Sequence, residues 1–361
     1  MDELKFFLTL SPMTRGFFFF LTKALTVLYA GVLWLRHACY DTGLIKSVRP
    51  AIPTLCIGNI TVGGTGKTPH TELVLRLCHR DMPVAVLSRG YGRISKGFRY
   101  VAVDDCVADV GDEPLQIKKK FPQAVVAVDR NRLEGVKKIQ EDHPQVKLVV
   151  LDDAFQYRKL NPSFSILLSP YSRPFTRDTL LPFGRLRDLP AQAKRAQVVV
   201  VSKAPPTISS LEREHQYKML KISKNQQLFF SCYTYGPPCA LFPQVPAFDS
   251  SPVMADKVIA LTGIARPESF LAHIGKQARV LEHLKFPDHH RFTKKDALRI
   301  HALQTKHPGI PIYTTEKDAL RLWELPCLSP QVQAALYYIP VCAELCSPRE
   351  HRRFVELLTG L

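Results

Sequence analysis

A glycine-rich segment carries the clearest chemistry in the sequence. The apolar residues 52–57 lead into Thr61-Val62-Gly63-Gly64-Thr65-Gly66-Lys67-Thr68, and a helical apolar pattern begins after Pro69. A strand, a glycine-rich loop, Lys-Thr and a helix together are typical of a phosphate-binding loop, because backbone N–H groups converge on phosphate oxygens at a helix start. Lys67 would contact the β- and γ-phosphates of a nucleotide, and the Thr68 hydroxyl would bind Mg²⁺.

The first position of this loop departs from the usual motif. Thr61 stands where glycine is normally found. Gly63 and Gly64 are candidates to supply the turn instead, since glycine adopts positive φ angles without steric cost. A glycine-rich turn without a ligand is the alternative, but it fits the flanking strand and the Lys-Thr pair poorly.

A second apolar segment ends in acids that could complete a metal site. Residues 146–151 are apolar apart from Lys147, and Asp152 and Asp153 follow directly. At the carboxyl end of a central parallel strand, one carboxylate can bind Mg²⁺ while its neighbour interacts with a base or a water. A solvated strand end without function is the alternative interpretation.

Further apolar runs, separated by helical stretches, predict the rest of a sheet. They cover residues 84–87, 124–128, 164–168 and 197–201. Continuous apolar strands that alternate with helices indicate a parallel sheet covered on both faces, so the predicted fold class is α/β. ATP is the expected nucleotide, because Ser202-Lys203-Ala204-Pro205 follows the last run where guanine-specific relatives carry an aspartate.

The composition fits a folded protein with acidic partners. At roughly 150 residues per domain, 361 residues suggest two domains, and a hydrophobic content of 46% excludes wholesale disorder. The net charge of +17 is compatible with nucleic acid, anionic lipid or a phosphorylated substrate. The nine cysteines include no CxxC pair, which argues against both a zinc site and a secreted disulfide scaffold.

The N-terminal region contains a long apolar segment. Between Gly16 and Leu35 the only charge is Lys23, and basic residues flank the segment. As a helix it would be roughly 30 Å long, enough to cross a bilayer core. We expect a membrane-associated helix, either spanning or lying on the membrane; a cleaved signal peptide and a buried core helix are the alternatives. If the helix spans, the basic cluster after Leu35 predicts that the rest of the chain is cytoplasmic.

Several segments, taken with the phosphate loop, resemble the tetraacyldisaccharide 4′-kinases of lipid A biosynthesis. They occur in the family's order, at residues 58–69, 88–93, 111–114, 152–156, 184–188, 286–290 and 314–318. Each is weak alone, but together they are specific. The resemblance implies transfer of the ATP γ-phosphate, with Mg²⁺, to the 4′-hydroxyl of an acylated glucosamine disaccharide 1-phosphate. The product would be lipid IVA, made at the cytoplasmic face of the bacterial inner membrane.

The family's fold implies a P-loop NTPase-like lobe and a smaller α/β/α lobe joined by a two-stranded linker. The predicted division is a membrane-associated helix over 1–36, the phosphate-loop lobe over 37–226, and the second lobe with the linker over 227–341. The last residues, 342–361, would form a helix that docks on the first lobe. The expected linker strands are residues 227–233 and 336–341, and residues 258–263 would begin the second core.

The resemblance also assigns roles to single residues. Asp112 matches the family's proposed base, which would accept the proton of the sugar hydroxyl. His289 matches the histidine that pairs with this base across two lobes. Arg187 would stabilise charge on the transferred phosphoryl group, which Lys67 would position. Residues predicted to contact nucleotide or acceptor are Arg89, Arg93, Arg130 and Asp188, the last standing where the family usually has glutamate.

Two other functions fit parts of the sequence. A nucleotide-dependent metallochaperone or membrane-targeting switch shares the phosphate-loop architecture, but it should show Cys/His clusters and guanine specificity, and the sequence shows neither. A nucleic-acid-binding ATPase would fit the charge, but the sequence has no nucleic-acid-binding module, so no nucleic acid partner is expected. The oligomeric state is left open.

Overall fold

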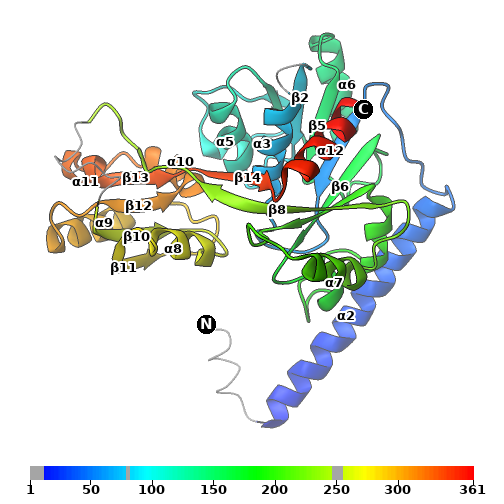
Figure 1. Ribbon diagram of the computed structural model, residues 1–361, viewed down its shortest axis with the longest axis horizontal. Helices are drawn as coiled ribbons and strands as arrows, with labels where there is room; N and C mark the ends of the chain where they lie inside the picture. Colours follow the sequence, from blue (N-terminus) through cyan, green and yellow to red (C-terminus); the bar gives the residue numbers. More distant parts are fainter. Residues whose placement is uncertain (1–11, 79–81, 246–254) are drawn as a thin grey trace.

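The computed structural model describes residues 12–78, 82–245 and 255–361. Two α/β lobes lie side by side, each built on its own sheet, and a long N-terminal helix projects from the first lobe (Figure 1). The predicted α/β fold class is confirmed. All nine cysteines are free thiols.

The first lobe is built on a nine-stranded sheet with the order β14-β8-β7-β6-β1-β5-β2-β4-β3. Its strands are β1 Thr54–Gly58, β2 Val84–Ser88, β3 Arg99–Tyr100, β4 Val125–Val128, β5 Leu148–Asp152, β6 Phe164–Pro170, β7 Val198–Ser202, β8 Gln227–Tyr235 and β14 Val341–Leu345. The strands from β8 to β4 pair in parallel, whereas β3 and β14 are antiparallel edge strands. The carboxyl ends of β1 and β5 are neighbours, since Ile57 is in register with Asp152.

Helices cover both faces of this sheet, which explains the continuous apolar strands. On one face, Leu55 and Ile57 of β1 join a buried cluster with α3 Lys67–Cys78, α5 Asp112–Lys120 and α12 Pro348–Thr359. On the other face, Cys56 joins a cluster that includes the N-terminal helix α2, α6 Arg132–Asp142 and α7 Ser210–Leu220. Shorter helices are α4 Val107–Val110 and the 3₁₀ turns η1 Phe175–Arg177 and η2 Pro190–Arg195.

The second lobe is built on a five-stranded sheet with the order β11-β10-β12-β13-β9. Its strands are β9 Cys239–Ala240, β10 Lys257–Thr262, β11 Arg279–Lys285, β12 Ile312–Thr315 and β13 Leu336–Ile339. The covering helices are α8 Glu268–Ile274, α9 Lys294–Lys306, α10 Glu316–Trp323 and α11 Pro330–Ala335. Phe270 of α8 packs on one face, and Ile300 of α9 with Leu322 of α10 pack on the other.

A two-stranded antiparallel ribbon of β8 and β14 connects the lobes (Figure 1). The prediction that residues 336–341 form its second strand was wrong. Leu336–Ile339 is β13 of the second sheet, and the partner of β8 is Val341–Leu345. Pro340 separates the two strands, because proline has no N–H to donate to a ladder. The domain boundaries at 227 and 341 stay a prediction, since β8 and β14 extend the first sheet while reaching the second lobe.

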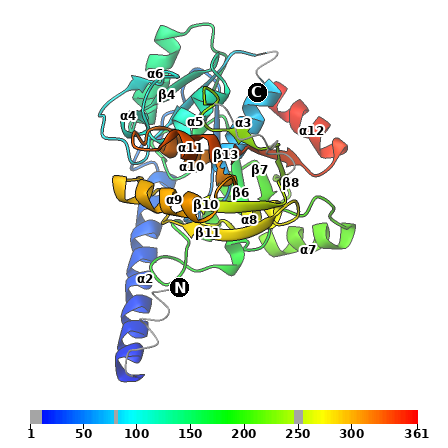
Figure 2. The same ribbon diagram turned by 90° about the vertical axis from the view of Figure 1, so that its left-hand side faces the viewer.

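Helix α2, Pro12–Asp41, is exposed along most of its length and extends beyond the first lobe (Figure 2). Leu33 and His37 are buried against the lobe, but the exposed fraction is 74% for Phe20, 72% for Val27 and 65% for Trp34. The stretch Phe18–Asp41 is long and apolar enough to cross a membrane, judged by length and composition. Among the side chains described in this helix, only those on one narrow face are therefore buried against the first lobe.

Candidate functional site

The phosphate loop connects β1 to α3 at the carboxyl edge of the first sheet. Gly63 has φ +83° and Gly66 has φ +93°, both in the region that favours glycine. Of the two predicted turn glycines, it is therefore Gly63 that adopts the special angle. A Cβ at Gly66 would also lie 2.2 Å from Tyr233 Oη. The loop is braced at Thr65, whose hydroxyl accepts from Asn59 Nδ2 at 2.6 Å.

The predicted acids lie beside this loop at the end of β5. Asp152 is buried, and its carboxylate accepts hydrogen bonds from Thr71 Oγ1 at 3.3 Å and Ser88 Oγ at 3.2 Å. Asp153 is paired with Lys67, whose Nζ lies 3.6 Å from Oδ2, and with Arg187. The structure thus brings together Lys67, Asp153 and Arg187, while Thr71 and Ser88 are neighbours that the sequence analysis missed.

The two adjacent carboxyl groups differ in acidity. Burial, and then the Asp153 charge, raise the pKa of Asp152 to about 6. Burial also opposes ionisation of Asp153, but Lys67 and Arg187 outweigh it and lower the pKa of that carboxyl. Within the described residues Asp152 has two hydroxyl donors and no ion pair with a cationic side chain. The adjacent carboxylates of Asp152 and Asp153 offer the hard oxygen donors that Mg²⁺ prefers, so these residues fit that metal.

Arg187 is held at the mouth of the phosphate loop. Its backbone N–H donates to Ile60 O at 2.9 Å, and its Nη1 donates to Asp153 Oδ2 at 3.2 Å. Its other terminal nitrogen bonds to Asn59. A guanidinium in this position would face phosphate oxygens bound by the loop, as expected for a group that stabilises a transferred phosphoryl.

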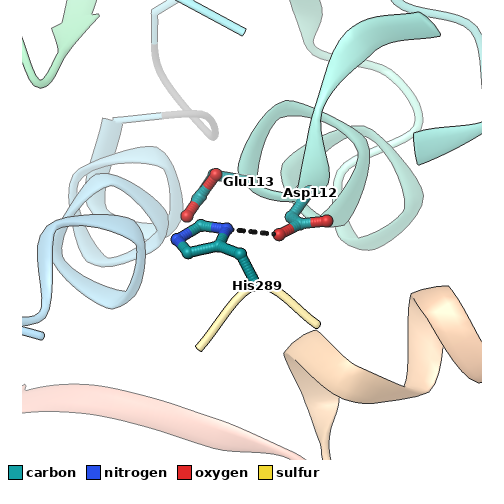
Figure 3. Close-up of side chains that lie close together, drawn as sticks. All are labelled: Asp112, Glu113 and His289. Atoms are coloured by element: carbon teal, nitrogen blue, oxygen red, sulfur yellow. Dashed lines mark hydrogen bonds and ion pairs between the residues drawn. The ribbon is translucent and has the colours of Figure 1, made fainter. Parts of the chain in front are cut away.

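A second cluster is assembled from both lobes (Figure 3). Asp112 begins α5 of the first lobe, and His289 lies after β11 of the second. His289 Nδ1 is 2.9 Å from Asp112 Oδ2. His289 has φ +57°, an angle that is uncommon in a non-glycine residue and often marks functional sites, and Gly111, which precedes Asp112, has φ +94°, an angle that favours glycine. The pairing predicted from the resemblance is present.

Helix α10 supplies two further cations to this cluster. Arg321 Nε donates to Asp112 Oδ1 at 3.0 Å, and its Nη2 bonds to Oδ2. Lys317 Nζ bonds to Glu113 Oε1 at 2.7 Å and lies 3.2 Å from His289 Nε2. Burial would raise the pKa of Asp112, but the hydrogen bonds from His289 and Arg321 hold it well below its usual range. Asp112 is therefore ionised at neutral pH.

Sequence reasoning missed Arg321 and gave the 314–318 segment no role. A signal was available, because Lys317 and Arg321 are four residues apart and so share one face of a helix. The ligand atoms of Asp112, Glu113 and His289 also lie within 4.8 Å of one another, close enough to hold a metal ion. Since Arg321 and Lys317 already neutralise both carboxylates, we interpret the cluster as a proton-handling site instead.

The predicted arginines fall into different environments. Arg89 and Arg130 are exposed just beyond the carboxyl ends of β2 and β4, on the edge that carries the phosphate loop. Arg93 is buried, and its guanidinium donates to Ser95 Oγ at 3.2 Å and to Gly97 O at 2.5 Å. Arg89 and Arg130 are thus open to a ligand, whereas Arg93 braces its own loop.

Asp188 lies against the N-terminal helix. It is fully buried, and its Oδ1 is 2.6 Å from His37 Nε2. Nearby on the same helix, Tyr29 Oη donates to Arg187 O at 3.0 Å, and Arg36 Nη2 donates to Gln156 O at 2.6 Å. The structure therefore gives Asp188 a partner within the protein, and α2 contacts the segment that carries Arg187. The sequence analysis predicted neither contact.

Comparisons with known proteins identify relatives over most of the chain. The family model described as Tetraacyldisaccharide-1-P 4′-kinase matches residues 18–359. The tetraacyldisaccharide 4′-kinase of Phocaeicola vulgatus is 40% identical over 319 residues, 87% of this chain and 87% of that relative. The enzyme of that name from Bacteroides thetaiotaomicron is 38% identical over 90% of this chain and 88% of its own length. The crystal structure of LpxK from Aquifex aeolicus in complex with ATP has a TM-score of 0.69 and 26% identity, covering 92% of this chain and 96% of that one.

Proposed function

The chain belongs to the tetraacyldisaccharide 4′-kinase family and is an ATP-dependent kinase of lipid A biosynthesis, and from this premise we propose how its residues divide the reaction. The observation that carries the proposal is the position of Asp112 and His289. They face each other from two lobes. Glu113, the neighbour of Asp112, also raises the pKa of Asp152, although burial and the charge of Asp153 raise that pKa more. This supports a proton-accepting role for the pair close to the phosphate loop.

The phosphate loop would hold ATP. Backbone N–H groups of residues 61–68 and the Lys67 ammonium would bind the β- and γ-phosphates, with the N-terminus of α3 adding positive charge. Thr68 and Asp152 would hold Mg²⁺, with Asp153 adjacent, and a bound Mg²⁺ neutralises phosphate charge and fixes its orientation. Arg187 would then stabilise the phosphoryl group as it moves to the acceptor.

Asp112 would accept the proton of the acceptor's 4′-hydroxyl. A phosphoryl transfer with a loose transition state does not need a strongly basic group, so an ionised carboxylate of lowered pKa suffices. Each carboxylate oxygen has two lone pairs, so Asp112 can accept a substrate hydroxyl in addition to its bonds with Arg321 and His289. His289 and Arg321 would orient the carboxylate. Because both come from the second lobe, the base would be correctly placed only when the lobes meet, which limits hydrolysis of ATP.

The substrate would be an acylated glucosamine disaccharide 1-phosphate, and the exposed apolar side of α2 would bind the membrane that holds it. Phe20, Val27, Leu28 and Trp34 form part of that side, and Lys23 lies among them. Basic residues after the helix would lie near anionic head groups. We place the lobes at the cytoplasmic face of the bacterial inner membrane, where ATP is present.

The direct test of function is transfer from labelled ATP in the presence of Mg²⁺. A panel of acylated glucosamine disaccharide 1-phosphates would be offered in mixed micelles, and products would be scored for a 4′-phosphate. We expect 4′-phosphorylated product with the full-length chain and none without acceptor. Label that appears only as inorganic phosphate, with every acceptor, would overturn the proposal.

The membrane role of α2 can be tested without deleting the helix. Replacing Phe20, Val27 and Leu28 with serine removes exposed apolar side chains that are not part of the hydrophobic core, so the lobes should stay folded. We expect the triple variant to sediment less with anionic vesicles, because each exposed apolar side chain contributes about 1.5–3 kcal/mol when buried. A matched triple variant at the exposed positions Leu211, Leu298 and Tyr217 of the lobes should bind vesicles normally. Equal sedimentation of all three proteins would contradict the anchor.

A further inference from the structure

A pocket beside the phosphate loop is lined by residues from both lobes. Thr61 and Gly63 come from the loop, and Arg266 comes from the segment between β10 and α8 of the second lobe. The remaining charged lining residues are Arg173, Asp178 and Arg185, which lie between β6 and β7. Three guanidinium groups and one carboxylate thus face one small space next to the loop, and the proposed mechanism uses none of these four side chains.

The positive charge of this pocket is not balanced within the protein. Asp178 is already paired, because Arg173 Nε lies 2.9 Å from its Oδ2 and the Arg185 backbone N–H donates to its Oδ1 at 3.1 Å. Within the described residues, the guanidinium groups of Arg185 and Arg266 have no salt-bridge partner. Burial, and then the charges of Arg185 and Arg173, lower the pKa of Arg266 despite the nearby Glu268 and Asp178. Crowded cations of this kind are stabilised by an anion.

A buried hydroxyl in the same wall also lacks a partner. Thr61 is 7% exposed, and its Oγ1 makes no hydrogen bond within the described part of the chain. A buried polar atom without a partner costs free energy, and a ligand oxygen in the pocket would satisfy it. The hydroxyl and the guanidinium groups together provide donors for several oxygens of one anion.

The wall of the pocket also contacts the N-terminal helix. In the loop between Asp178 and Arg185, the Phe183 backbone N–H donates to Thr26 Oγ1 of α2 at 3.3 Å, and the Phe183 ring lies 5.5 Å from that of Phe19. The segment that carries Asp178 and Arg185 therefore also contacts the helix proposed to bind the membrane. An anionic group of a lipid substrate would reach this place from the membrane side.

We propose that Arg173, Arg185 and Arg266 form a second phosphate subsite, adjoining the phosphate loop, that binds a terminal dianionic phosphate group. The proposal rests on the proposed function, which offers two such groups: the 1-phosphate of the acceptor and the γ-phosphate of ATP. Planar guanidinium groups bind phosphate oxygens in pairs, which lysine cannot do. Because Arg266 belongs to the second lobe, a phosphate bound here also joins the lobes.

The experiment compares Arg266→Ala and Arg185→Ala with the wild type in the full-length chain. KM is measured for an acceptor with and without its 1-phosphate, and Kd is measured for a non-hydrolysable ATP analogue. Arg279→Ala is the matched control, since Arg279 is an exposed arginine at the opposite end of the second sheet, where β11 begins. Arg266→Lys keeps the positive charge but cannot bind two phosphate oxygens in a pair, so it should recover only part of the affinity that Arg266→Ala loses.

We expect Arg266→Ala to raise KM about tenfold or more for the 1-phosphorylated acceptor, since a charged hydrogen bond contributes about 1.5–3 kcal/mol. The acceptor without 1-phosphate should bind both proteins equally poorly. If Kd of the ATP analogue rises instead, the subsite holds the γ-phosphate. Equal losses on both acceptors with unchanged Kd, or values equal to those of Arg279→Ala, would overturn the subsite. Failure of the wild type to make 4′-phosphorylated product would overturn the proposed function itself.

Discussion

The two halves of the candidate site are built in different ways. Lys67 begins α3 after the loop that follows β1, and Asp152 and Asp153 lie at the end of the neighbouring strand β5, where Ile57 and Asp152 are in direct register. Asp112 and His289 come from separate lobes, which a two-stranded ribbon connects. The nucleotide half is therefore fixed by the fold of one lobe, whereas the acceptor half depends on how two lobes meet.

Because of this difference, ATP binding and phosphoryl transfer should respond to different substitutions. The contacts described for Lys67, Asp152 and Asp153 all lie within the first lobe, so we expect that ATP can bind before the acceptor half is complete. The acceptor half is closed by contacts between lobes: Arg321 with Asp112, Lys317 with Glu113, and Lys120 Nζ with Glu316 Oε2 at 3.0 Å. A substitution in the first half should lower nucleotide binding or transfer directly, and one in the second half should lower transfer while ATP still binds.

The largest effect is expected at the phosphate loop. Lys67→Ala removes the ammonium that pairs with Asp153 and that we propose positions the γ-phosphate. We expect kcat to fall by about 10³-fold or more. Initial rates with saturating acceptor and ATP measure this loss, and Lys224→Ala, in a surface turn of the same lobe, is the control. If the kcat of Lys67→Ala were within tenfold of the wild-type value, Lys67 would not have the proposed role.

The base of the acceptor half should show the next largest effect. Asp112→Asn keeps the shape but cannot take up a proton, so we expect kcat to fall by about 10²–10³-fold. Kd for an ATP analogue should change little, because the nucleotide half is untouched. The control is Asp104→Asn, which makes the same carboxylate-to-amide change at an exposed residue of the loop after β3. If Asp112→Asn weakened ATP binding as much as it slowed transfer, the two halves would not be separable.

Arg321 should affect the acceptor half without taking part in the chemistry. Arg321→Ala leaves the buried Asp112 without its two guanidinium bonds, which costs about 3–5 kcal/mol of stability. We expect about a tenfold loss of kcat, a lower Tm and an unchanged Kd for the ATP analogue. Arg321→Lys retains the charge, so its pH–rate profile should resemble the wild type more closely. Full activity in Arg321→Ala would show that His289 alone orients Asp112.

The smallest effect is a pH dependence in the nucleotide half. Burial, and then the Arg266 charge, lower the pKa of Lys203 to about 8, and its Nζ lies close to Gly64 of the phosphate loop. Bound phosphate favours the ammonium, so ATP binding should be linked to proton uptake, and affinity should fall as pH rises through 8. We expect a decrease of up to about tenfold between pH 7.5 and 9.5, by calorimetry in buffers of different ionisation enthalpy. A Lys203→Met variant that shows the same pH dependence would exclude Lys203 as its source.

The same difference explains what could be predicted from the sequence. The phosphate loop and the Asp152-Asp153 pair are recognisable because a strand, a turn and a helix are local, and adjacent parallel strands bring their carboxyl ends together. Asp112 and His289 were found only through the resemblance, because nothing local connects residues in different lobes. Arg321 and the His37–Asp188 contact were missed for the same reason. Pro340, by contrast, is a local signal that divides β13 from β14.

Helix α2 would have a mechanical consequence at the membrane that we propose it binds. It is one continuous helix from Pro12 to Asp41, exposed in its outer turns and bonded through Tyr29 and His37 to the segment that carries Arg187 and Asp188. If α2 binds the membrane as we propose, such a connection would act as a rigid strut, not a flexible tether, and would hold the two lobes at a fixed height and tilt above the lipid. The search for the acceptor would then take place in two dimensions. The substrate would slide within its leaflet into a waiting cleft instead of leaving the bilayer to reach it.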